Sequence, residues 1–184
     1  MFISAATLVR DWPDQAPHAS LTHEAGDALD AAGLPGDAEA AYRRAADLWR
    51  AAGQPDSAAR AIRAVAWTLV QRDDPDWAGA LALFDEAATA SDAERAETLF
   101  QAVQLVLDWP AVTRPADLAG RALAMADEAA AALRGSGDLE RAIRADLLAA
   151  EALGGPLADP DAAAARVAAA RQRAVDAGVK HLVE

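Results

Sequence analysis

A short pattern of small and larger residues recurs along the chain at a nearly constant spacing, and it constrains the fold more than any other feature. The pattern is a small residue, usually a larger one four positions on, and an alanine three further on. Its copies are Ala38-x3-Tyr42-x2-Ala45, Ala80-x3-Phe84-x2-Ala87, Ala122-x3-Ala126-x2-Ala129 and Ala163-x3-Val167-x2-Ala170. The middle positions are 42, 42 and 41 residues apart. Self-similarity at such a period is typical of proteins built from stacked helical units.

Most of the chain is expected to be helical, because alanine, leucine, arginine and glutamate dominate and runs of β-branched residues are scarce. Glycine ends a helix in the left-handed conformation, and proline or aspartate opens the next one. Stop-and-restart signals of this kind stand at 33–37, 53–56, 73–76, 110–115, 135–138 and 154–156. They predict eight helices, at about residues 17–32, 37–52, 56–72, 76–90, 92–109, 115–134, 138–153 and 160–178. Ser91 and Glu94 have the spacing of a capping box.

The recurring pattern has a physical interpretation in terms of helical hairpins. The small residue lets the second helix approach the first, the larger one fills the seam a turn away, and the next alanine admits the following hairpin. A lone hairpin leaves an apolar face uncovered, so copies must stack. The first helix of hairpin two carries Ile62-x2-Val65-Ala66-x2-Leu69, and that of hairpin one carries the smaller Thr22-x2-Ala25-Gly26-x2-Leu29.

These patterns resemble those of the tetratricopeptide-repeat (TPR) family, whose second helix carries a small, an aromatic and a small residue at this spacing. The resemblance covers about residues 17–178, although the period here exceeds the roughly 34 residues of that family. It implies an all-α, right-handed solenoid of about four antiparallel hairpins, at about 17–52, 56–90, 92–134 and 138–178. We therefore expect a TPR-like repeat domain over 17–184, preceded by an arm or short helix over 1–16.

Composition excludes several other classes of protein. The chain of 184 residues has no cysteine, which excludes a disulfide framework, a thiolate zinc site and a thiol nucleophile. The formal net charge of −12 argues against nucleic acid or an anionic membrane as the main partner. The apolar run at the N-terminus is too short for a secretory signal or a membrane span. We expect a soluble cytoplasmic protein, and the alanine and arginine bias resembles that of GC-rich bacterial genomes.

The polar stripe of each first helix is expected to face the concave side of the stack. The resemblance implies that such a groove holds a peptide or protein surface, with a homodimer as one arrangement. The predicted partner-binding residues are His23, Asp27, Asp30, Arg60, Arg63, Trp67, Gln71, Glu94, Glu97 and Gln101. The alternative is that these residues form ordinary solvated helix faces with ion pairs along each helix. Trp67 either presents a ring that stacks on a guanidinium for a partner or packs against the next hairpin.

Charge is unevenly distributed along the sequence. Residues 1–40 carry net charge −6, residues 41–72 carry +4, and residues 73–100 carry −7. An arginine-rich band between two acidic ones can steer a partner of mixed charge, or it can complement neighbouring hairpins within the protein. The sequence leaves both interpretations open.

Catalytic signatures are weak, and we expect a non-enzymatic interaction module with no cofactor and no metal. Asp73, Asp74 and Asp76 resemble a magnesium-binding run, but an aspartate before a helix more often caps its free N–H groups. His18 and His23 lack the spacing of a helical metal pair, and there is no phosphate-binding loop or nucleophile elbow. Two alternatives remain: a regulatory sensor that binds a small molecule or signalling peptide, and a metal-dependent all-helical enzyme.

Overall fold

The computed structural model describes residues 15–179 and 181, and within them the protein is all-α, with no strand. The helices are α2 (Ala16–Ala31), α3 (Pro35–Ala51), α4 (Pro55–Val70), α5 (Trp77–Ala87), α6 (Asp92–Asp108), α7 (Leu118–Ser136), α8 (Leu139–Gly154) and α9 (Pro160–Asp176). Each predicted helix is confirmed, with ends displaced by three residues at most. The predicted N-terminal arm lies outside the described residues except for its last two, and Ala16 already belongs to α2.

The largest displacement at a helix start has a clear local cause. The sequence predicts a helix from residue 115, but α7 begins at Leu118. The chain after α6 instead folds into a turn, in which the N–H groups of Thr113 and Arg114 donate to the carbonyl of Pro110. The guanidinium of Arg114 also donates to three carbonyls at the end of α6, including that of Val106 at 3.1 Å. These residues therefore satisfy the C-terminus of α6 before α7 can start.

Most helix boundaries use the signals that the sequence predicts. Gly33 and Gly53 adopt φ of 72° and 69° after α2 and α3, a conformation in which a Cβ atom is disfavoured. Asp76 accepts a hydrogen bond from the N–H of Gly79 at 2.8 Å, so it caps α5 as the capping interpretation requires. The expectation fails after α8, where Gly155 has φ of −94° and the left-handed residue is Ala158, with φ of 53°.

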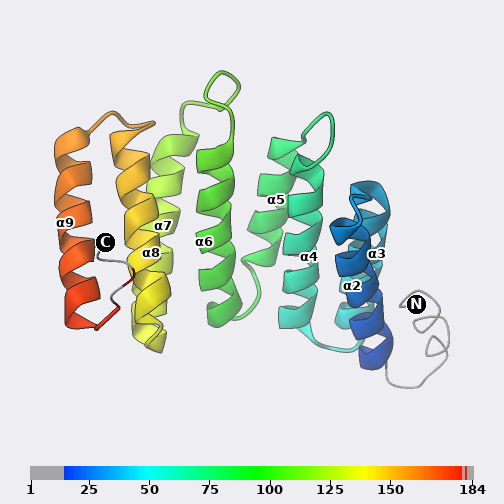
Figure 1. The fold of residues 1–184 in the computed structure, drawn as a ribbon. Helices are drawn as coiled ribbons and strands as arrows, with labels where there is room; N and C mark the ends of the chain where they lie inside the picture. The colour runs from blue at the N-terminus through cyan, green and yellow to red at the C-terminus, as the bar shows by residue number, and fades with distance from the viewer. Residues whose placement is uncertain (1–14, 180, 182–184) are drawn as a thin grey trace. The chain divides into compact units, whose positions relative to one another are not determined.

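The chain forms two compact units, one up to Glu94 and the other from Arg95. In the first unit, α2, α3, α4 and α5 pack against one another in chain order, and in the second α7, α8 and α9 do the same (Figure 1). Consecutive helices in each unit run back and forth, joined by short connections. Packing between chain neighbours is the arrangement that a row of helical hairpins requires.

Burial confirms the register of the recurring pattern in its first three copies. The middle positions Tyr42, Phe84 and Ala126 are buried, and so are the flanking alanines of all three copies. In the fourth copy only Ala170 is fully buried. The first-helix pattern of α4 is also confirmed, because all four of its residues lie in the core.

The small position of α2 shows why the pattern needs a small residue. A Cβ atom built on Gly26 would stand 2.6 Å from Cδ1 and Cε1 of Tyr42, which extends from α3. Carbon atoms in contact ordinarily lie about 3.5–4.0 Å apart, so only glycine fits while the ring keeps this place. The seam between α2 and α3 therefore depends on the pairing of a glycine with a tyrosine.

Among the described helices, none combines the length and the apolar character needed to cross a membrane.

Candidate interaction surface

The predicted residues of α2 form a small polar cluster with a residue from α3. His23 and Asp27 lie one turn apart, with His23 Nε2 3.8 Å from Asp27 Oδ1. The hydroxyl of Tyr42 donates to the same oxygen at 2.8 Å, and its ring meets that of His23 edge-on with centroids 5.2 Å apart. The ring of Tyr42 thus packs in the core, while its hydroxyl forms a hydrogen bond at the surface.

Burial and neighbouring charges set the protonation of this cluster. Burial lowers the pKa of His23 below 6.5, and Arg60 lowers it further, whereas the carboxylates of Asp27 and Glu24 raise it in part. Burial raises the pKa of Tyr42 well above its ordinary value, helped by the hydrogen bond to Asp27. At neutral pH the imidazole of His23 and the phenol of Tyr42 are therefore both neutral.

A second cluster joins α4 to the start of α6 within the first unit. The Oε1 atom of Glu94 accepts a hydrogen bond from Arg60 Nε at 2.8 Å, and its Oε2 atom accepts one from Arg63 Nη1 at 2.7 Å. The side chain of Arg60 is 58% exposed, whereas that of Arg63 is only 9% exposed. Arg60 thus lies on the solvated face that the alternative interpretation describes, whereas Arg63 is almost fully covered.

The capping-box prediction at this site is correct only in part. Ser91 Oγ accepts the N–H of Glu94 at 3.4 Å, which is one half of the box. The N–H of Ser91 donates instead to Asp56 Oδ1 at 3.2 Å, from the start of α4. The carboxylate of Glu94 is thereby available for the two arginines, so a tertiary ion pair replaces the local bond.

Trp67 packs inside its own hairpin. Its ring meets that of Phe84 from α5 edge-on, with centroids 5.7 Å apart and planes at 79°. This geometry is the favoured one for aromatic pairs. This contact is neither of the two alternatives stated for Trp67, a guanidinium stack for a partner and a contact with the next hairpin, and both of these stay predictions.

The remaining predicted residues are more scattered. Gln71 is exposed at the end of α4, and Asp30 is half-buried on α2, with one carboxylate oxygen enclosed and no hydrogen-bond partner among the described residues. In the second unit, Gln101 donates to Glu97 at 2.6 Å. Arg141 of α8 lies 2.9 Å from the other oxygen of Glu97. The hydrogen bonds and ion pairs of the predicted residues therefore fall into three groups, two in the first unit and one in the second.

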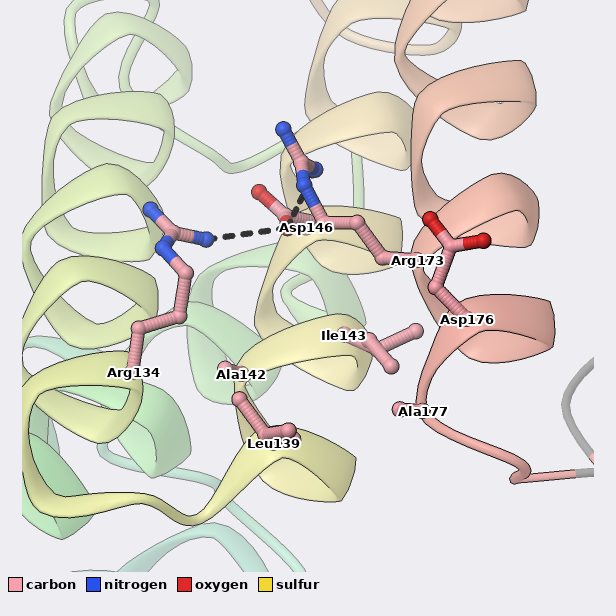
Figure 2. A pocket seen from close by; sticks show the side chains of 8 residues that line it. All are labelled: Arg134, Leu139, Ala142, Ile143, Asp146, Arg173, Asp176 and Ala177. Carbon is pink, nitrogen blue, oxygen red and sulfur yellow. Dashed lines mark hydrogen bonds and ion pairs between the residues drawn. The ribbon is translucent and has the colours of Figure 1, made fainter.

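The largest charged cluster of the second unit is absent from the sequence prediction. The carboxylate of Asp146 on α8 is 2% exposed and accepts Arg134 from α7 at 3.1 Å and Arg173 from α9 at 2.8 Å (Figure 2). Arg166 of α9 donates to its other oxygen at 2.8 Å and also to Asp127. The signal available in the sequence was an aspartate within an otherwise apolar face of α8, but nothing in it identified the three arginines.

No protein-family model matches the chain, and no curated protein is detectably similar to it in sequence.

Proposed function

We propose that the protein is a non-enzymatic interaction module of TPR-like solenoid architecture, which binds a peptide or protein surface through the polar row of its first helices. In the first unit this row comprises His23 and Asp27 on α2, Arg60 on α4 and Glu94 at the start of α6. Packing of helices in chain order and the buried recurring pattern support the solenoid part of the proposal.

One observation carries the binding part of the proposal: the exposed guanidinium of Arg60 is held in place before any partner arrives. Glu94 fixes Arg60 Nε at 2.8 Å, and the buried Arg63 fixes Glu94 in turn. Because the side chain is already ordered, a partner carboxylate that meets Arg60 pays less entropy of immobilisation. The exposed Asp27 places a negative charge on α2, and the effect of Arg60 on the pKa of His23 shows that the two helices interact electrostatically across this face.

The partner that fits this face has mixed charge, with an acidic group for Arg60 and a basic group for Asp27. Such complementarity raises the association rate and fixes the register more than it adds raw affinity. Binding is therefore expected to weaken as ionic strength rises.

The test compares surface variants that leave the core intact. Arg60→Gln together with Asp27→Asn removes both exposed charges while the asparagine can still accept from Tyr42. Arg44→Gln, at an exposed position of α3, is the matched control. Affinity capture from the native host, quantified by mass spectrometry, is expected to lose a specific partner with the double variant and to keep it with the control. A partner retained at full strength by the double variant contradicts the assigned surface.

The sensor alternative has one observation in its favour, a cavity in the second unit that is lined by residues of α7, α8 and α9. The enzyme alternative has none: Asp76, one of its three proposed ligands, caps α5.

A further inference from the structure

Asp146 is a buried carboxylate that forms ion pairs with three arginines. Arg134, Arg166 and Arg173 all donate to it, and Asp127 is the one other carboxylate that these arginines engage among the described residues. Burial alone would lower the pKa of Arg166, but its hydrogen bonds to Asp127 and Asp146 raise it above its ordinary value. These hydrogen bonds keep the guanidinium of Arg166 charged, and Arg134 and Arg173 add two more guanidinium groups to the same carboxylate.

A cavity of about 240 Å³ opens beside this cluster, within the second unit. Its apolar part is formed by Leu139, Ala142 and Ile143 of α8 and by Ala177 at the end of α9. Arg134 and Arg173 enter it from α7 and α9 and reach toward Asp146 from opposite sides (Figure 2). The cavity thus combines an apolar wall with two cations at one end.

Among the residues that the structure describes, these two arginines pair with Asp146 alone and keep donors for another acceptor. Each directs one nitrogen to Asp146, and their side chains are 38% and 46% exposed. A guanidinium carries five N–H groups, and its planar fork suits a carboxylate. An added carboxylate between Arg134 and Arg173 would meet ordered donors, because Asp146 already holds both side chains in position.

We propose that this cavity binds a small aliphatic carboxylate, with its charged end on Arg134 and Arg173 and its apolar body on Leu139 and Ile143. Asp176 is at the rim, on the same face of α9 as Arg173, and accepts a hydrogen bond from Gln172 at 2.9 Å. An amino acid would add an ammonium group from which Asp176 can accept a hydrogen bond. A simple fatty or oxo acid carries no such group. Both kinds of ligand carry a carboxylate, and the experiment below distinguishes between them.

The test titrates the full chain with isocaproate and isocaproamide, and follows backbone amide shifts by heteronuclear NMR. The two probes have the same branched body, and only the first carries a charge. Isocaproate is expected to give saturable shifts confined to α7, α8 and α9, and the amide is expected to bind at least about tenfold more weakly. Absence of saturable shifts, or equal binding of the amide, overturns the proposal.

Three variants test which side chains bind the carboxylate of the ligand and which form the apolar wall of the cavity. Arg173→Gln leaves Asp146 with two arginines and is expected to weaken isocaproate at least about tenfold. Arg171→Gln, an exposed position two residues earlier on α9, is the matched control and should leave the affinity unchanged. Ala177→Leu keeps every charge and is expected to block the cavity. Equal weakening by Arg171→Gln and Arg173→Gln would mean that any nearby positive charge has the same effect on affinity, and it would overturn the proposed site.

Leucine distinguishes the two sources of the carboxylate. Tighter binding of leucine than of isocaproate, lost in Asp176→Asn, supports the proposal with an amino acid as the ligand. Weaker binding of leucine supports it with a simple carboxylic acid. The first-unit surface takes no part in this test, so its outcome is independent of the proposed interaction function.

Discussion

Replacement of Gly26 by alanine tests the packing of α2 against α3. The added Cβ atom would stand 2.6 Å from two ring carbons of Tyr42, about 1 Å inside ordinary contact. The ring is buried and its hydroxyl is held by Asp27 at 2.8 Å, so any shift also strains that hydrogen bond. Steric relief by a free rotation is therefore not available to Tyr42.

The expected magnitude combines three contributions. Overpacking of a core costs about 1–3 kcal/mol. Loss of the Tyr42–Asp27 hydrogen bond adds about 1 kcal/mol, a value near the lower end for a charged acceptor because Asp27 is exposed. Alanine in place of glycine within a helix returns about 1 kcal/mol. Gly26→Ala should therefore lower the free energy of unfolding by about 1–3 kcal/mol.

The assay is urea unfolding followed by far-UV circular dichroism, with Gly120→Ala as the matched control. Gly120 is also helical, and no heavy atom lies within 4 Å of a Cβ atom built on it, so its replacement should be neutral or stabilising. In a Tyr42→Leu background the cost of Gly26→Ala should shrink by more than about 0.5 kcal/mol, because the clash is with the ring. Equal stability of Gly26→Ala and the wild type would refute the steric argument.

Three further predictions concern charged groups. Asp146→Ala is expected to lower the free energy of unfolding by about 2–3 kcal/mol in thermal or urea unfolding, less than for a fully buried pair because its arginines are partly exposed. His23 has a lowered pKa in the folded state, so the unfolded chain binds the proton first and stability should fall as pH drops below about 6.5; His23→Gln should remove that part of the pH profile. Arg60→Glu should destabilise the protein by repelling Glu94, whereas Arg60→Gln, which removes one charge without adding another, should cost less, as urea unfolding of the two variants measures.

Periodicity and turn chemistry were sufficient to predict the helices, because both are local properties of the sequence. The alanines in the first three copies of the recurring pattern are buried where the pattern places them, and Gly33 and Asp76 act at the helix ends as their chemistry requires. The α8–α9 connection shows the limit of this reasoning: two glycines adjoin the end of α8, yet Ala158 takes the left-handed conformation. The position of the glycines therefore did not predict which residue adopts that conformation.

The candidate surface was less predictable because it depends on long-range pairs. A helical stripe identifies which residues share a face, but it does not tell which of them another helix covers. Arg63 was placed in the partner-binding stripe for this reason, although it is buried and its ion-pair partner Glu94 lies 31 residues further along the chain. Asp146 was missed because its three arginines come from two other helices, at separations of 12 to 27 residues.

Packing in chain order has a consequence for how each unit folds. Helices that meet chiefly their immediate neighbours close only short loops, so little entropy is lost before the first contacts form, and folding is expected to be fast. Because contacts are local, loss of one helix disturbs few of the others. Loss of α9 would expose Ile143 and remove two of the arginines that pair with Asp146, yet leave the packing of α7 against α8 in place. Partial opening from a terminal helix is accordingly the lowest-energy fluctuation to expect, and in the second unit it would open the cavity from its α9 side.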